Sequence, residues 1–193
     1  MRIAASLLLL ATLASAQGLI NRRAPSFSLP DSNYTQFDIL DYRGKWLLVT
    51  FMMATEQNCP TCKDLAKKLD ALQTKYAGKL NILGIVQTPQ DNQDTVKRFL
   101  AETKLKIPML FDYSFVGIAY FKATPTRQAI DIPHAFAVDP NGTIVQDWSQ
   151  PLLSGANFSS DVDKLIARPT GAPAAVPAAA AKAAPTAKAK SKK

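Results

Sequence analysis

Two largely apolar runs, residues 47–53 and 80–86, are the clearest pattern along the chain. Runs of this kind are typical of central strands that are covered on both faces of a sheet. Between them, in residues 60–76, apolar positions recur at spacings of three and four: Leu65, Leu69, Leu72 and Tyr76. That spacing places them on one face of a helix. The pattern therefore predicts a strand, a helix and a second strand in succession.

Shorter segments before and after this unit give more local signals. Residues 24–30 contain two prolines and are expected to be extended, and residues 34–40 alternate weakly, as a strand does. The later elements are expected as a helix over 91–104 capped by Asp91 or Asn92, an extended segment over 109–111, a short helix over 114–121, strands over 135–138 and 143–148, and a final helix over 157–167. The turn between the two late strands, 139–142, ends in Asn-Gly, a hairpin signal.

The order of these elements determines the fold class. Strands that alternate with helices become parallel neighbours, whereas strands joined by a tight turn pair antiparallel. We therefore predict an α/β fold, with a mixed β-sheet flanked by helices on both faces. A chain of 193 residues has room for one ordinary domain with additional ends.

The first sixteen residues have the three parts of a secretion signal. Arg2 is the positive start, four successive leucines at 7–10 lie in the apolar stretch, and Ala14-Ser15-Ala16 is a small-residue cleavage site. We therefore interpret residues 1–16 as a signal peptide. The protein is expected to be exported, either periplasmic or extracellular, and tethered to the membrane if the signal is not cleaved. Outside the cytoplasm, disulfide bonds persist.

Charge and composition divide the remaining chain. We assign residues 17–23 to a mobile lead, 24–167 to the folded domain and 168–193, mostly Ala, Pro and Lys, to a disordered tail. Arg2 and the tail together account for seven of the eight net positive charges, which leaves about +1 on residues 17–167. We expect a monomer without a specific nucleic-acid partner. The basic tail is interpreted as a solvated spacer or as a weak contact with a membrane or another anionic surface.

Cys59-Pro60-Thr61-Cys62 contains both cysteines of the chain. It lies between the predicted strand and the predicted helix, where unpaired N–H groups and the helix dipole favour a thiolate. Pro60 suits a first helical turn because proline has no N–H. Cys59 is expected to be the exposed, attacking sulfur, and Cys62 the more buried, resolving sulfur. The motif predicts a redox-active dithiol that works without a further cofactor or a metal.

Three other interpretations of the cysteines stay open at this point. A structural disulfide here would close a loop of two residues, and short loops gain least from cross-linking. A closed zinc site needs four ligands, but the chain offers only His134 beside the two cysteines. The third interpretation is a pair of buried, inert thiols.

Two stretches resemble the exported thioredoxin-like oxidoreductases of the TlpA/ResA type, within the redoxin or AhpC-TSA superfamily. One is residues 41–51 leading into the cysteine motif, and the other is residues 132–142, which begin with Ile132-Pro133-His134. The resemblance implies a thioredoxin fold and a cis peptide bond before Pro133. It also implies a loop at Ile132 and Pro133 that faces the dithiol and binds a substrate strand through its backbone.

The resemblance further implies thiol–disulfide exchange with a protein disulfide or dithiol as the substrate. An upstream thiol would then supply the electrons that return the pair to its reduced form. Reduction of protein disulfides is the expected direction. The chain departs from the family where Asn58 replaces a usual Trp and where a longer loop contains Glu56. A nearby Glu56 carboxylate would raise the pKa of the thiol. His134 could act in the opposite sense, so Pro60, Thr61, Glu56 and His134 are candidate modulators of the dithiol.

Two rival functions use the same residues. In a peroxiredoxin-like thiol peroxidase, Cys59 would be oxidised to sulfenic acid and resolved by Cys62. The Glu56 and Pro133 positions depart from the pattern of that family, which usually has Thr or Ser and Arg there. In a non-enzymatic copper-binding or copper-delivery module, Cys59, Cys62 and His134 would be soft ligands, joined by Met52 and Met53.

Overall fold

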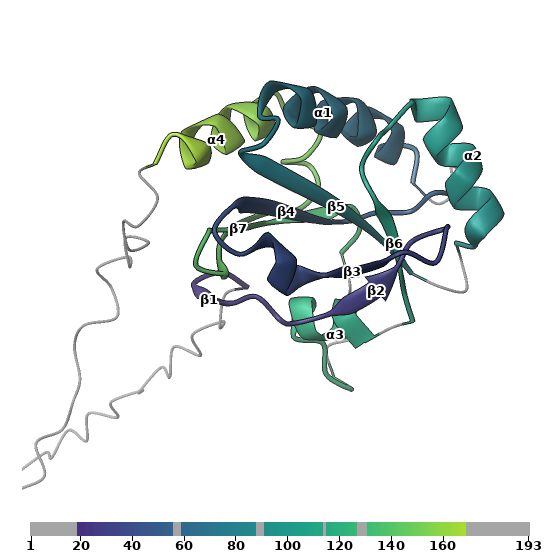
Figure 1. The fold of residues 1–193 in the computed structure, drawn as a ribbon, viewed down its shortest axis with the longest axis horizontal. Coiled ribbons are helices and arrows are strands. Elements are labelled where there is room, and N and C mark those ends of the chain that lie inside the picture. Colours follow the sequence, from purple (N-terminus) through teal and green to yellow (C-terminus); the bar gives the residue numbers. More distant parts are fainter. Residues whose placement is uncertain (1–18, 56–58, 88–90, 114, 127–130, 169–193) are drawn as a thin grey trace, which may run out of the picture.

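The protein is described by a computed structural model over residues 19–55, 59–87, 91–113, 115–126 and 131–168. Its centre is a six-stranded sheet with the order β1-β8-β7-β4-β5-β6 (Figure 1). Strands β4, β5 and β6 are parallel, whereas β7 is antiparallel to both β4 and β8, and β1 is antiparallel to β8. Strands β2 and β3 form a separate antiparallel pair.

The strands are β1 (Arg22–Arg23), β2 (Ser28–Pro30), β3 (Gln36–Asp38), β4 (Trp46–Phe51), β5 (Leu80–Gln87), β6 (Met109–Asp112), β7 (His134–Val138) and β8 (Thr143–Trp148). The helices are the 3-10 helix η1 (Ile39–Tyr42) and the α-helices α1 (Cys62–Lys75), α2 (Gln93–Thr103), α3 (Phe115–Phe121) and α4 (Asn157–Ile166).

Side chains near the helix starts set the boundaries of α2 and α3. Asn92 accepts hydrogen bonds from the N–H groups of Asp94 and Thr95, and the Thr95 hydroxyl accepts from the N–H of Asn92. Such reciprocal capping satisfies N–H groups that have no partner within the helix. At α3, the carboxylate of Asp112 accepts from the first three N–H groups of the helix. The cap of α2 is therefore Asn92, and the Asp91 side chain does not cap this helix.

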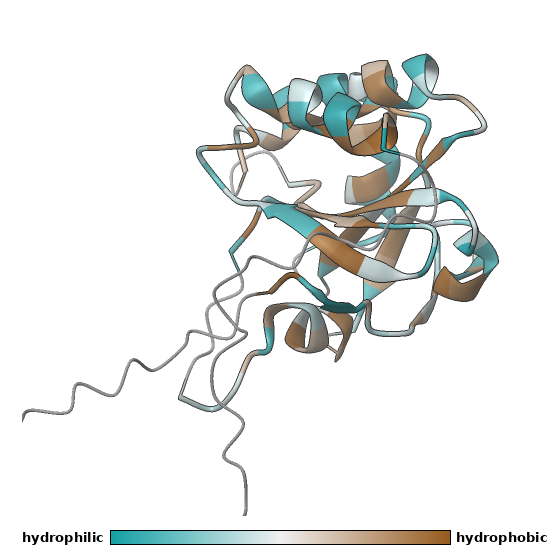
Figure 2. Cartoon of the chain, turned by 90° about the vertical axis from the view of Figure 1, so that its left-hand side faces the viewer, coloured by the Kyte–Doolittle hydropathy of each residue, from teal (hydrophilic) through white to brown (hydrophobic). Residues whose placement is uncertain are grey.

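Helices cover both faces of the sheet, which confirms the predicted mixed α/β architecture. Helices α1, α2 and α4 lie on one face, and α3 lies on the other together with η1 and the β2–β3 hairpin (Figure 1). Along β4, Trp46 and Leu48 point to the first face, and Leu47 and Val49 to the second. All six residues of β4 are buried, as expected of a central strand. Figure 2 shows hydrophilic residues on the outer sides of the helices.

The first third of the chain differs in detail from the prediction. Residues 34–40 form only a three-residue strand, because Asp38 caps η1 by accepting from the N–H of Leu40. Arg22 and Arg23, which we assigned to the lead, pair with Ile144 and Thr143 of β8. The folded part therefore includes the last residues of the expected lead.

Several predicted segments lie outside the described residues. These are the signal peptide at 1–16, the tail beyond Arg168 and the residue Glu56. Within the described part of the chain, none of the helices combines the length and the apolar character needed to span a bilayer.

Candidate active site

Both cysteines lie where the central strand β4 passes into helix α1. Cys59 and Cys62 form a disulfide with a Cα–Cα distance of 5.3 Å. The Cys62 N–H donates to the Cys59 carbonyl at 3.1 Å, so the motif forms a turn and α1 starts at Cys62. The helix points its unpaired N–H groups towards the motif, as the sequence predicted. The cysteines are therefore paired at a helix N-terminus.

Both sulfur-bearing residues are buried in this oxidised form. Cys59 is 4% exposed and Cys62 is 0% exposed. The prediction that Cys62 is the more buried of the two is confirmed, whereas the prediction that Cys59 is exposed is wrong. The physical reason is that Cys59, bonded to the fully buried Cys62, packs in the apolar cluster beneath α1, which also contains Met52 and Leu65.

Two polar groups contact the sulfurs. The N–H of Met53 lies 3.4 Å from the Cys62 sulfur and donates to it. The hydroxyl oxygen of Thr61 lies 3.7 Å from the Cys59 sulfur. Donors beside a sulfur favour its ionised form over its neutral form. Of the candidate modulators within the motif, Thr61 thus contacts the dithiol, whereas Pro60 is exposed to solvent.

A buried carboxylate holds the chain just before the cysteine motif. Asp91 is 1% exposed and accepts hydrogen bonds from the N–H groups of Ala54 and Thr55 at 3.1 and 2.9 Å. The Thr55 hydroxyl also donates to it at 2.9 Å. The sequence indicated Asp91 only as a helix cap, because its partners are 36 and 37 residues away in the chain. The available signal was an acidic residue, Asp91, next to a helix start that Asn92 can cap by itself.

The bond between Ile132 and Pro133 is cis, as the resemblance implied. Pro133 is buried, Ile132 is half-buried, and strand β7 begins at the next residue. His134 pairs with Phe51, the last residue of β4. The proline therefore stands at the same end of the sheet as the cysteine motif, since that motif follows β4.

His134 does not serve the dithiol. Its ring stacks on Phe136 with centroids 4.5 Å apart and lies edge-on to Phe121 at 5.0 Å. These residues belong to the cluster beneath α3, whereas both cysteines belong to the cluster on the other face of the sheet. The prediction that His134 modulates Cys59 is therefore wrong. Side chains alternate along β7, so a position next to Pro133 in sequence points away from the cysteines.

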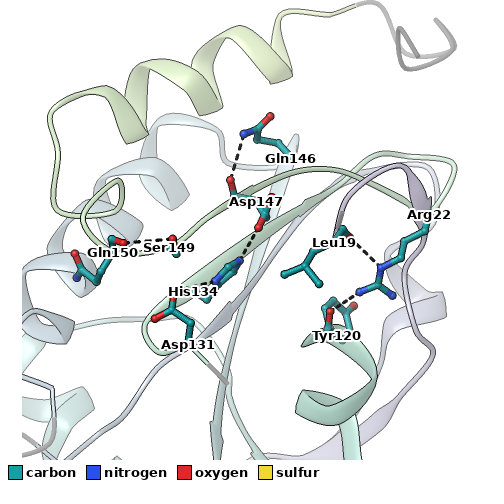
Figure 3. A network of polar contacts seen from close by, with 9 residues as sticks. All are labelled: Leu19, Arg22, Tyr120, Asp131, His134, Gln146, Asp147, Ser149 and Gln150. Carbon is teal, nitrogen blue, oxygen red and sulfur yellow. Dashed lines mark hydrogen bonds and ion pairs between the residues drawn. The ribbon is translucent and has the colours of Figure 1, made fainter. Parts of the chain in front are cut away.

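The polar partners of His134 are two aspartates. Its Nε2 lies 2.9 Å from the Asp147 carboxylate, and its Nδ1 lies 3.8 Å from that of Asp131 (Figure 3). On the same side of the molecule, the Arg22 guanidinium donates to the carbonyls of Leu19 and Tyr120 (Figure 3). Burial lowers the pKa of Arg22 and raises that of the Tyr120 phenol.

The structure does not bring the proposed copper ligands together. His134 and the cysteines lie on opposite faces of the sheet. Met52 is fully buried beside the disulfide as a packing residue. Among the described residues, no group of three or more His, Cys, Asp or Glu side chains is arranged to hold a metal ion. The copper-binding interpretation is therefore not supported, because its ligand set is divided by the sheet.

Residues 20–147, more than half of the chain, match the model of the AhpC/TSA family. The chain belongs to the AhpC/TSA family. This confirms the predicted membership of the redoxin superfamily.

The chain is also similar to individual oxidoreductases and to a protein named as a peroxiredoxin. The thiol-disulfide oxidoreductase ResA of Bacillus thuringiensis is 25% identical over 129 residues, which are 66% of this chain and 68% of ResA. Rv2521 of Mycobacterium tuberculosis, named provisionally as a peroxiredoxin, is 28% identical over 130 residues, 64% of this chain and 80% of Rv2521. The crystal structure of a thioredoxin-family thiol:disulfide interchange protein from Chlorobium tepidum has a TM-score of 0.61 at 19% identity. The match covers 75% of this chain and 93% of the other.

The fold and the family agree with the chemistry of the cysteine pair. The thioredoxin-like fold is shared with the Chlorobium tepidum protein, and the pair at the start of α1 is a disulfide. The predicted class of the protein, a thiol–disulfide oxidoreductase, is confirmed, and this class works on protein thiols with redox partners.

Proposed function

We propose that this protein is an exported thiol–disulfide oxidoreductase that reduces protein disulfides through Cys59 and Cys62. The observation that carries the proposal is the Cys59–Cys62 disulfide at the N-terminus of α1. A structural cross-link would add little, because it closes a loop of only two intervening residues. The residual exposure of Cys59 makes it the sulfur that a substrate reaches first.

The proposed reaction consists of two exchanges. The Cys59 thiolate attacks one sulfur of a substrate disulfide, which forms a mixed disulfide and releases the other substrate sulfur as a thiolate. The Cys62 thiolate then attacks the Cys59 sulfur and breaks the mixed disulfide. The substrate gains two electrons and, from solvent, two protons, and the Cys59–Cys62 disulfide forms. An upstream thiol reductant then returns two electrons to the pair.

The loop at Ile132 and Pro133 is proposed to bind the substrate strand. Proline has no N–H to donate, and Ile132 and Pro133 lie just before the first residue of β7. Backbone groups at such a strand end need partners from outside the sheet. An extended substrate segment can pair with those groups while its disulfide approaches Cys59. The assignment is supported by the position of this loop at the carboxyl end of β4, where the cysteine motif also begins. We further propose that the protein acts as a monomer and is either periplasmic or extracellular, since residues 1–16 have the three parts of a secretion signal.

A thiol peroxidase is the second candidate, and the match to Rv2521 favours it. In that reaction Cys59 would reduce a peroxide, form a sulfenic acid and then a disulfide with Cys62, with release of water. Stopped-flow mixing of the reduced protein with hydrogen peroxide separates the two. A rate constant no greater than that of free cysteine would exclude the peroxidase.

Removal of either cysteine tests the proposed function most directly. In an insulin-reduction assay with dithiol-reduced protein, Cys59→Ala is expected to abolish activity, because no thiolate starts the exchange. Cys62→Ala is expected to trap a mixed disulfide that non-reducing electrophoresis detects. Full activity in Cys59→Ala would contradict the proposal. The reduction potential then gives the direction: a value near about −270 mV indicates a reductant and one near about −120 mV an oxidant.

A further inference from the structure

The loop after β8 brings a glutamine side chain to the cysteine motif. The Gln150 Nε2 donates to the Thr61 hydroxyl oxygen at 2.9 Å. That oxygen in turn lies 3.7 Å from the Cys59 sulfur. On the other side, the Ser154 hydroxyl donates to the Gln150 Oε1 at 2.7 Å. A line of hydrogen bonds therefore runs from Ser154 through Gln150 and Thr61 to Cys59.

The direction of these hydrogen bonds follows from the groups involved. A hydroxyl has one hydrogen to donate and two lone pairs that accept. Because the amide of Gln150 occupies a lone pair of Thr61, the Thr61 hydrogen remains available for the Cys59 sulfur. Thr61 stands at the N-cap of α1, where a threonine often accepts from the first helical N–H groups, yet its side chain makes no such bond. Its hydroxyl is turned to the sulfur instead.

The loop that holds Gln150 is fixed to α1. The Lys68 ammonium donates to the carbonyls of Leu153, Ser154 and Gly155 at 2.7, 2.8 and 3.1 Å. Leu153 is 1% exposed and packs in the same cluster as the disulfide. Gln150 directly follows Ser149 at the exit from β8 (Figure 3). The amide is thus supported from both sides, by α1 and by the strand before it.

We propose that Gln150 is a positioning residue for the attacking cysteine. It holds the Thr61 hydroxyl as a donor to the Cys59 thiolate and so increases the fraction of Cys59 that is ionised at neutral pH. The proposal rests on the proposed function only for the role of Cys59 as the attacking thiol. Because Gln150 is 89 residues from Thr61 in the chain, the cysteine motif alone does not reveal it.

The charged groups on the described elements next to the cysteine motif are the same in every variant of the test. On α1 they are Asp64, Lys68 and Lys63, which is paired with Glu102 at 3.0 Å, and before the motif Asp91 holds the loop at Ala54 and Thr55. A charge near a thiol shifts its ionisation. None is altered by a substitution at Thr61 or Gln150, so a difference between variants reports the hydrogen-bond line.

The pH dependence of iodoacetamide alkylation of the reduced, full-length protein tests the proposal. Thr61→Val is expected to raise the pKa of Cys59 by about one unit, the size of one charge-assisted hydrogen bond. Thr61→Ser keeps the hydroxyl and is expected to retain the wild-type pKa. Gln150→Ala is expected to raise the pKa by roughly half a unit. In a Thr61→Val background, Gln150→Ala is expected to add nothing.

Controls make each outcome decisive. Gln146→Ala removes a half-buried glutamine within β8 itself and is expected to leave the pKa of Cys59 unchanged. Mass analysis of the alkylated peptide shows whether Cys59 or Cys62 reacted, which separates a wrong nucleophile from a wrong positioning residue. If Gln150→Ala disturbs the loop, as circular dichroism would show, Ser154→Ala at an exposed position replaces it. An unchanged pKa in Thr61→Val, or equal effects of Gln150→Ala with and without Thr61, would overturn the proposal.

Discussion

The two faces of the sheet use buried polar groups in different ways. Beneath α1, the packed cluster contains the two cysteine sulfurs, which contact the N–H of Met53 and the hydroxyl of Thr61. Beneath α3, the His134 Nε2 lies 2.9 Å from the Asp147 carboxylate (Figure 3), and the imidazole ring packs against Phe121 and Phe136. The first face keeps a bond that can be broken and re-formed at a helix start. The second face encloses its histidine among packed aromatic rings and carries neither cysteine.

This difference shows that nearness in sequence is a poor guide to nearness in a sheet. His134 directly follows Pro133, but its side chain points to the face opposite the cysteines. Gln150 is far along the chain and contacts the motif. Substitutions beneath α3 should therefore change stability without changing redox chemistry.

The largest expected effect is on the aromatic cluster beneath α3. Phe136 is 0% exposed, and its ring meets those of Phe51, Tyr120 and Phe121 with centroids 6.0, 5.2 and 5.4 Å apart. Phe136→Ala is expected to lower the free energy of unfolding by about 3–5 kcal/mol, because it opens a cavity. Urea denaturation measures the loss. The potential of the Cys59–Cys62 couple should stay at the wild-type value, and a shift of that potential would contradict the separation of the two faces.

Substitution of Asp91 is expected to cost less stability than Phe136→Ala but to slow insulin reduction as well. Asp91→Asn weakens the hydrogen bonds to Ala54 and Thr55, which should cost about 1.5–3 kcal/mol. The loop before Cys59 would then be held less firmly, so insulin reduction should be slower at temperatures where the variant is folded. Asp94→Asn, an exposed residue three positions later, is the matched control. Equal activity of the two variants would show that the anchor serves stability alone.

The histidine–aspartate pair should matter for stability by a lesser amount. Asp147→Ala removes the partner of His134 Nε2 and should cost about 1 kcal/mol, since the ring is buried and its Nδ1 already lacks a hydrogen bond among the described residues. Adding His134→Phe to that variant should recover much of the loss, because an apolar ring suits the cluster. Urea denaturation of the single and double variants measures both effects. A double variant less stable than Asp147→Ala would contradict this account.

These expectations also show what the sequence could predict. The strands at 46–51 and 80–87, the helix at 62–75 and the late hairpin are set by local periodicity and turn residues, so the sequence indicated them. The cysteine pair was predicted equally well because its spacing and its junction are local. The contacts of Asp91 with Ala54 and of Gln150 with Thr61 depend on the tertiary arrangement of loops, which a single sequence does not encode as a pattern. The burial of Cys59 was not predicted because it depends on packing in a cluster whose other members come from distant parts of the chain.

The smallest expected effect concerns acid sensitivity at the far end of α1. The Lys75 ammonium and then the Tyr76 hydroxyl donate to Asp163 of α4, and both hydrogen bonds lower the pKa of that carboxyl. A lowered pKa means that the stabilisation is present above the unfolded value of about 3.9 and is lost as the pH falls through the folded value. Asp163→Asn should therefore lose stability at pH 7 but little below pH 3 or so. Thermal unfolding between these pH values measures the difference, which should be small because the pair is exposed.

The two edges of the six-stranded sheet determine how readily another polypeptide could add a strand to it. One edge is β1, a strand of two residues, and the other is β6, a strand of four residues, where Asp31 forms a bridge with Leu110. Long open edges invite another polypeptide to add a strand and begin aggregation. Short and partly covered edges leave few unpaired backbone groups on which another chain could add a strand.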